Sequence, residues 1–215
     1  MDWRAESRRA LGFTLIEVLL AAALFLLTLG LVFSVLVPGM RSYSRGSDRA
    51  ELQQMAALAT RRILADLEAA APGSVGLLSS SGAGEPEALG LVRLQDVSPA
   101  GRQVWEEQAI VYYWIPAEGN LVRKLWPPAP PQPVVPMTKE RPPTIFPSLL
   151  REIVQQSNGT ETMVAARVAR FRVRSAGVGP GVVQPLKLEL LLERLGGSGT
   201  EQFELTRDIY LRNSL

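Results

Sequence analysis

The stretch Gly12-Phe13-Thr14-Leu15-Ile16-Glu17-Val18 begins a long apolar segment and decides how the fold starts. From Val18 to Met40 the sequence contains no Asp, Glu, Lys or Arg. A helix of that length extends about 35 Å, which is enough to cross a hydrocarbon core of about 30 Å. The carboxylate of Glu17 is costly to place in hydrocarbon and needs a partner. The sequence therefore predicts a membrane-inserted helix with one functional acidic residue.

The composition excludes several kinds of catalytic site. The chain of 215 residues has no His and no Cys, so it cannot form a Ser-His-Asp triad, a Cys-His pair or an ordinary zinc site. The run Gly177-Val178-Gly179-Pro180-Gly181 lacks the spacing of a nucleotide-binding loop and is typical of a turn. The net charge of +2 is too small to indicate nucleic-acid binding. We expect no enzyme activity, no cofactor and no metal site.

Helical periodicity continues beyond the apolar segment. At Pro38-Gly39 we expect a kink or a brief interruption, because proline lacks an amide donor. Apolar residues then recur every three or four positions, at Leu52, Met55, Ala56, Ala59, Ile63 and Leu67. The polar faces are expected to carry Arg49, Gln53, Arg61 and Asp66. Pro72-Gly73 is expected to end the helix near Ala71.

The rest of the chain shows strand patterns. They cover residues 89–94, 104–115, 121–126, 161–174, 186–192 and 203–211. Turn residues at 116–120 and 196–199 join two pairs of these strands into hairpins. Residues 127–147 are too rich in proline for a central strand, and residues 148–156 are a short helix with a serine cap. One long helix followed by an antiparallel sheet predicts an α+β fold in which the sheet covers the apolar stripe of the helix.

The N-terminal sequence resembles the processing and assembly motif of type IV pilins and type II secretion pseudopilins. The matching residues are a short basic leader that ends in Gly12, the sequence Phe13 to Val18 and the apolar helix. In that family a prepilin peptidase cuts after the glycine and methylates the new N-terminus. The resemblance implies leader cleavage between Gly12 and Phe13, N-methylation of Phe13, and a role for Glu17 in subunit assembly and register. The partner of the Glu17 carboxylate would be the amine of a neighbouring subunit's Phe13.

The resemblance also implies a division of the chain. Residues 1–12 are the leader, 13–37 the transmembrane and filament-core helix, 38–72 its amphipathic continuation, and 73–215 a soluble β-rich pilin-like domain that contains the Pro-rich loop 127–147. We expect a single-pass protein of the bacterial inner membrane whose C-terminal domain is periplasmic or otherwise extracytoplasmic, and which then joins other pilin-like subunits in a filament. A cleaved secretory signal would have a shorter apolar core, and an ordinary signal anchor leaves Glu17 unexplained. Basic residues flank the segment on both sides, so charge does not decide its orientation.

Three functional assignments are open at this stage. The arm Leu121–Pro127 and the strand that begins Pro185-Leu186 are similar to those of a J-type minor pseudopilin, which implies a structural subunit near the tip of a type II secretion pseudopilus that supports protein secretion. The first alternative is a minor pilin of a type IV pilus or a competence system, and only the DNA-uptake variant would have nucleic acid as a partner. The second is a membrane-anchored binding module that never assembles and uses the Pro-rich loop or the arginines of 161–174. These four arginines, Arg167, Arg170, Arg172 and Arg174, are expected on one solvated strand face.

Overall fold

The computed structural model describes residues 13–79, 87–128, 137–138, 142–177, 182–196 and 199–211. Its elements, in chain order, are α1 (Leu15–Glu68), β1 (Ala70–Leu78), β2 (Ala88–Val97), β3 (Gln103–Trp105), β4 (Ala109–Ile115), β5 (Asn120–Trp126), β6 (Met137–Thr138), α2 (Pro147–Gln155), β7 (Thr160–Ala165), β8 (Val168–Ser175), β9 (Leu186–Gly196) and β10 (Gly199–Ile209). The chain divides into two compact units, Met1–Gly46 and Ser47–Leu215, and α1 contributes to both.

The first unit contains the apolar half of α1. The large apolar side chains from Leu15 to Met40 that line this part of the helix are exposed. By length and composition, α1 is suited to cross a membrane. The helix continues through Pro38, so the predicted interruption is wrong. A proline removes one backbone hydrogen bond, and the bonds of the neighbouring residues are sufficient to keep the helical conformation.

In the second unit α1 packs through the predicted stripe. Leu52, Ala56, Ala59, Ile63 and Leu67 are completely buried, and Met55 is partly buried against the same cluster. The prediction for Asp66 is wrong, since its side chain lies in the interior instead of on a polar face. The reason is that two arginines of the sheet meet it there, as described below.

The helix ends earlier than the sequence predicted. It stops at Glu68, and Pro72-Gly73 lie inside the strand β1, which the sequence analysis missed. The pairing of β1 with β2 shifts register between Ala70 and Val75, so the proline falls at an irregularity in the ladder. Proline is tolerated at such positions because no regular hydrogen bond is lost.

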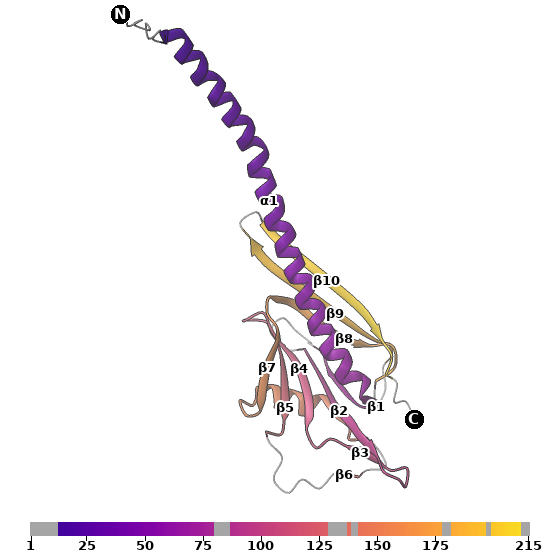
Figure 1. The fold of residues 1–215 in the computed structure, drawn as a ribbon. Helices are drawn as coiled ribbons and strands as arrows, with labels where there is room; N and C mark the ends of the chain where they lie inside the picture. The colour runs from indigo at the N-terminus through magenta and orange to yellow at the C-terminus, as the bar shows by residue number, and fades with distance from the viewer. Residues whose placement is uncertain are drawn as a thin grey trace, which may run out of the picture. The chain divides into compact units, whose positions relative to one another are not determined.

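The strands form two antiparallel sheets (Figure 1). The larger has seven strands in the order β6-β3-β2-β4-β5-β7, with β1 also paired to β2, and the smaller has the order β10-β9-β8. The predicted hairpins are present as β4–β5 and β9–β10. The α+β fold class is therefore confirmed, with two sheets where the sequence analysis expected one.

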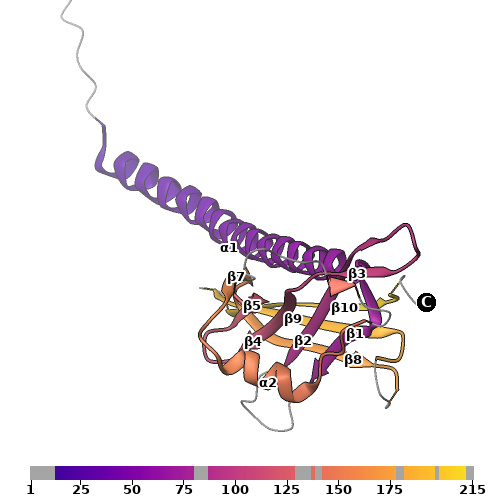
Figure 2. The ribbon, with the colours of Figure 1, turned by 90° about the horizontal axis from the view of Figure 1, so that it is seen from below.

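Both faces of the larger sheet are covered. In Figure 2, α1 and α2 lie on opposite sides of its strands. Alternate residues divide accordingly: Leu89, Leu91 and Ile110 join the cluster that contains the α1 stripe, whereas Val92 and Val111 join the one that contains Leu150 and Ile153 of α2. This alternation follows from the period of two along a strand.

Two predicted strands are each split in two. Residues 104–115 form β3 and β4, which pair with different stretches of β2, β3 with residues 94–97 and β4 with residues 88–91. Residues 161–174 form β7 and β8, which belong to different sheets. Between them Arg167 has φ 60°, a left-handed conformation that turns the chain away from the first sheet.

The short helix α2 begins at Pro147, so the predicted serine cap is wrong. Its N-cap is Phe146, which makes no side-chain capping bond. Proline suits the first helical position because its missing amide would have no partner there. The predicted loop 127–147 is described only in part, since residues 129–136 and 139–141 lie outside the described residues.

Candidate functional site

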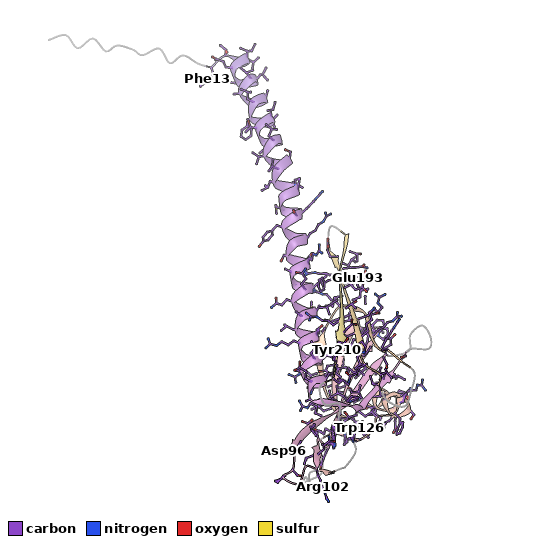
Figure 3. The ribbon with its side chains drawn as sticks, turned by 90° about the vertical axis from the view of Figure 1, so that its right-hand side faces the viewer. Phe13, Asp96, Arg102, Trp126, Glu193 and Tyr210 are labelled. Atoms are coloured by element: carbon purple, nitrogen blue, oxygen red, sulfur yellow. The ribbon has the colours of Figure 1, made fainter. Side chains whose placement is uncertain are left out.

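The first candidate site is the N-terminal end of α1, near Phe13 (Figure 3). Gly12 lies outside the described residues, and Phe13 is 88% exposed. Oε2 of Glu17 accepts hydrogen bonds from the backbone N–H and the hydroxyl of Thr14, both at 2.9 Å. In return the backbone N–H of Glu17 donates to Oγ1 of Thr14 at 3.4 Å. This reciprocal arrangement is a capping box.

The capping box gives Glu17 a role within its own chain. A carboxylate in the first turn satisfies a free backbone donor and is favoured by the helix dipole. The sequence analysis missed this role, although a Thr three residues before a Glu at the start of a helix is its known signature. The two contacts of the carboxylate both involve Oε2, and Oε1 has no hydrogen-bond partner in the part of the chain that the structure describes. One oxygen therefore remains able to accept a bond from another molecule.

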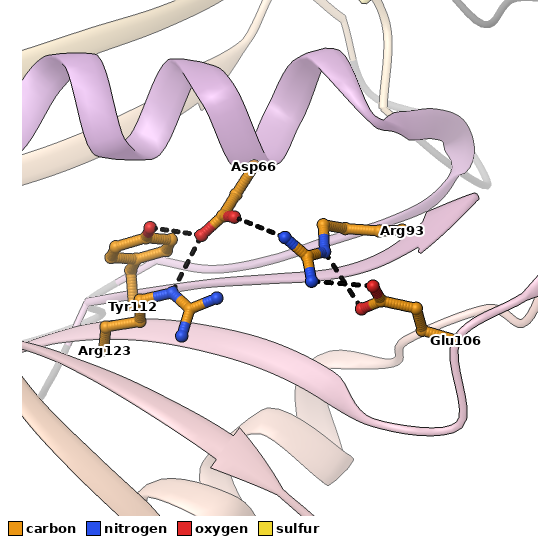
Figure 4. A network of polar contacts seen from close by, with 5 residues as sticks. All are labelled: Asp66, Arg93, Glu106, Tyr112 and Arg123. Carbon is orange, nitrogen blue, oxygen red and sulfur yellow. Dashed lines mark hydrogen bonds and ion pairs between the residues drawn. The ribbon is translucent and has the colours of Figure 1, made fainter. Parts of the chain in front are cut away.

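The second candidate site is a buried polar network centred on Asp66 (Figure 4). Its carboxylate accepts from Arg93 at 3.2 Å, from Arg123 at 2.8 Å and from the hydroxyl of Tyr112 at 2.6 Å. The guanidinium of Arg93 also makes two bonds to Glu106, at 2.9 and 2.6 Å. The network joins α1 to three strands, β2, β4 and β5, and to Glu106 in the loop before β4.

The contacts within the network favour one protonation state for Asp66, Tyr112 and Arg93. Burial raises the pKa of Asp66, but the hydrogen bonds from Arg123 and Tyr112 and the positive charges of Arg123 and Arg93 outweigh it, so the net pKa is lowered. Burial, and then the bond to Asp66, raise the pKa of Tyr112 and keep the phenol protonated. The hydrogen bond and charge of Glu106, opposed in part by burial, raise the pKa of Arg93. Each group is held in its hydrogen-bonding form, which suits a structural connection better than proton transfer.

A third polar cluster surrounds the fully buried Lys124. Its ammonium donates to the carbonyl oxygens of Ile153, at 3.1 Å, and of Gln156, and it pairs with Glu161 at 3.1 Å. The two carbonyls belong to the last turn of α2 and to the residue that follows it. A cation at the C-terminal end of a helix donates to carbonyls that have no helical partner, and it is attracted by the negative end of the helix dipole. Lys124 is therefore occupied in fixing α2 to the sheet.

The predicted arginine face is only partly realised. Arg170 pairs with Glu204 at 2.6 Å and Arg172 with Glu87 at 3.1 Å, both from β8. Arg167 precedes β8 and pairs instead with Glu51 of α1 at 2.8 Å. These arginines connect neighbouring elements, so they are not one open anion-binding surface.

The polar clusters described above offer no metal site and do not line the large groove of the second unit. Among the described residues there is no group of three or more acidic side chains placed to hold a metal ion. A groove of about 810 Å³ runs beside β1 and the start of α2, and its lining includes apolar residues and Arg174. Neither Asp66 nor Lys124 lines it. The described clusters therefore stabilise the fold, and the end of α1 is the candidate that faces outward.

Comparisons of the chain with protein-family models, with curated proteins and with solved structures found no match. The assignment of a function therefore rests on the residues and the geometry described above.

Proposed function

We propose that this chain is a minor pilin-like subunit, a structural component of a type II secretion pseudopilus located near the tip of the filament. In this proposal the prepilin peptidase removes residues 1–12 and methylates Phe13, and the mature chain leaves the inner membrane to join other pilin-like subunits. No catalytic step is assigned to it. The observation that carries the proposal is a carboxylate at the start of an exposed apolar helix, with one oxygen still available.

The geometry at Glu17 is compatible with two successive roles. In the membrane, the contacts with Thr14 satisfy part of the carboxylate within the chain. In the filament, the amine of a neighbouring subunit's Phe13 would pair with the second oxygen. The interaction energy of an ion pair in an apolar setting depends strongly on the relative position of the two charges. Such a pair would therefore fix the axial register of one subunit against the next.

Substitution of Glu17 separates these roles. Glu17→Leu removes both the capping bond and the charge, whereas Glu17→Gln keeps an acceptor for the capping box and removes only the charge. We expect both variants to insert into the membrane and both to be lost from sheared filaments, measured by immunoblot of membrane and filament fractions. Thr28→Leu is the matched control, because among the described residues its hydroxyl donates only to the carbonyl oxygen of Leu24 in its own helix. Wild-type incorporation of Glu17→Gln would reduce Glu17 to a helix cap.

Cleavage of the leader is tested independently. Replacing Gly12 with Leu should leave a precursor longer by the leader on an immunoblot, and deletion of the prepilin peptidase should give the same band with the wild-type chain. A mature band of unchanged size in either case would contradict the assignment of the Gly12–Phe13 bond.

Two other functions are distinguished by the same experiments. A minor pilin of a type IV pilus or a competence system would show the same cleavage and Glu17 dependence, but its loss would impair motility or DNA uptake and leave secretion intact. A membrane-anchored binding module would keep residues 1–12 and would be indifferent to Glu17. The groove beside β1 would then be its first candidate for a ligand site.

A further inference from the structure

The strand β10 leaves one edge of the smaller sheet open. Among the described residues it pairs only with β9, over 11 residues and without a shift of register. No backbone hydrogen bond to its other edge occurs in the described part of the chain. The free N–H and C=O groups of such an edge can pair with another strand, and proteins protect them with a proline, a bulge or a cover. β10 has neither a proline nor a bulge, and all of its residues except Ile209 are exposed or half-buried.

The other edge strands are less suited to pairing. β1 contains Pro72 and a shift of register, and Val75 within it is 3% exposed. The pairing of β8 with β9 shifts register between Val168 and Arg170. β7 has only six residues, and its pairing with β5 is also irregular. Among the described strands, β10 is therefore the longest regular edge that another strand could extend.

A groove of about 390 Å³ lies between β10 and α1. Its lining residues from β10 are Leu205 and Arg207, and those from α1 include Ala57, Arg61, Leu64 and Ala65. Because successive side chains of a strand alternate between its two faces, Phe203 and Glu201 point to the same side as Leu205. An extended segment paired with the edge of β10 would send alternate side chains into this groove, where the small residues Ala57 and Ala65 leave room for them.

The groove attracts negative charge. Arg61 and Arg207 both line it, and neither makes an ion pair or a hydrogen bond within the described chain. Glu68 is the acidic residue of the described lining, so the two arginines exceed it by one positive charge. A carboxylate that enters the groove is placed near two guanidinium groups, which bind carboxylates in a planar, bidentate geometry.

The opposite charge lies farther along the same face of β10. Glu201 is six residues before Arg207, which corresponds to about 20 Å in a strand. Its neighbour across the ladder, Arg194, pairs instead with two acidic residues of α1. Between the two charges the face carries Phe203 and Leu205, both partly buried against the main cluster. The face therefore presents a negative charge, two apolar residues and a positive charge in sequence.

We propose that β10 binds an extended segment of a partner protein, which adds to the smaller sheet as an antiparallel strand. The segment carries an acidic residue opposite Arg207 and a basic residue opposite Glu201. Between them, at alternate positions, are two apolar residues that face Leu205 and Phe203. Backbone hydrogen bonds to the open edge supply affinity, and the two charge pairs fix the register and the direction of the segment. This site lies on the second unit and depends neither on Glu17 nor on cleavage of the leader.

The test is a titration of the amidated peptide Glu-Thr-Val-Ser-Val-Thr-Lys, carrying fluorescein on a flexible linker, with the full chain in detergent micelles. Fluorescence anisotropy should rise saturably, and empty micelles are the blank. Two further peptides carry N-methyl groups on alternate residues, one at the second, fourth and sixth positions and the other at the third, fifth and seventh. Only one edge of an added strand faces β10, so one of these peptides should bind about tenfold more weakly and the other like the parent.

Two variants of the protein complete the test. Arg207→Glu should weaken the peptide about fivefold, and a peptide with Lys in place of its first Glu should restore binding to that variant. Arg102→Glu makes the same change of charge in the loop between β2 and β3, outside the groove, and should bind like the wild type. The proposal is overturned if no saturable rise occurs, if both N-methylated peptides bind alike, or if the Lys peptide does not restore binding to Arg207→Glu.

Discussion

Asp66 is the residue whose environment is hardest to infer from its neighbours in the sequence. It lies in an amphipathic helix among charged residues, yet its side chain is 4% exposed and meets Arg93 and Arg123 from the sheet. A buried ion pair does not by itself add much stability, because desolvation offsets the attraction. Removing one partner is different, since the other charge is then left buried and alone.

Replacing Asp66 with Asn should therefore destabilise the protein by about 3 to 5 kcal/mol, because Arg123 is 9% exposed and would lose its counter-charge. Urea unfolding of the detergent-solubilised chain, followed by tryptophan fluorescence, measures this loss. Glu51→Gln is the control: it breaks the pairs with Arg167 and Arg194, in which every side chain is 30% exposed or more, and should cost about 1 kcal/mol or less. Equal losses for the two variants would show that the network does not act as a buried unit.

At the scale of elements, glycines in the larger sheet determine how closely the chain before α2 can approach. A Cβ atom at Gly76 in β1 would overlap the carbonyl oxygen of Ile145, and one at Gly90 in β2 would overlap the side chain of Leu150. The side chain of Leu150 can move, but a backbone carbonyl held between β1 and α2 cannot move without displacing the segment. Gly76 is therefore the stricter requirement.

We expect Gly76→Ala to destabilise the protein by about 1 to 3 kcal/mol through this overlap. The matched substitution is Gly46→Ala in α1, where a Cβ would meet nothing within 4 Å and alanine favours the helix. The same urea titration should show no loss for Gly46→Ala and a gain of up to about 1 kcal/mol. If Gly76→Ala unfolds at the wild-type midpoint, the close packing of residue 145 on β1 is not a constraint on the fold.

At the scale of the whole molecule, both buried clusters lie within the second unit. Every residue in them, from Leu52 to Leu211, follows Ser47, and the exposed apolar half of α1 contributes to neither. The apolar half therefore has no stabilising role in the described core. A helix with so much exposed apolar surface is stable in lipid or against other helices, and not in water.

A chain that starts at Ser47 should thus be soluble, monomeric and folded without detergent. Size-exclusion chromatography gives its size, and near-UV circular dichroism from Trp105, Trp114 and Trp126 reports whether the core is packed. Loss of the near-UV signal would mean that the first unit is needed for the core after all. Normal folding would also provide a tractable sample for further binding experiments.

The features that depend on local pattern can be predicted from the sequence alone. An uncharged apolar segment of membrane length, a helical stripe from Leu52 to Leu67, and the turn residues of two hairpins are each readable because helix and strand impose fixed periods on neighbouring residues. The α+β class follows from their order. The capping box at Thr14 and Glu17 was equally local and could have been predicted, as its spacing is visible in the sequence.

Features that depend on residues far apart in the chain become visible only when the fold is known. β1 was missed because its pairing with β2 compensates for Pro72-Gly73, and residues 161–174 were predicted as one strand because no local pattern indicates that β8 pairs with β9. The burial of Asp66 and Lys124 likewise arises when separate strands and helices meet. The physical reason is that periodicity records which face of an element is apolar, whereas the partner of each polar group is chosen by packing in three dimensions.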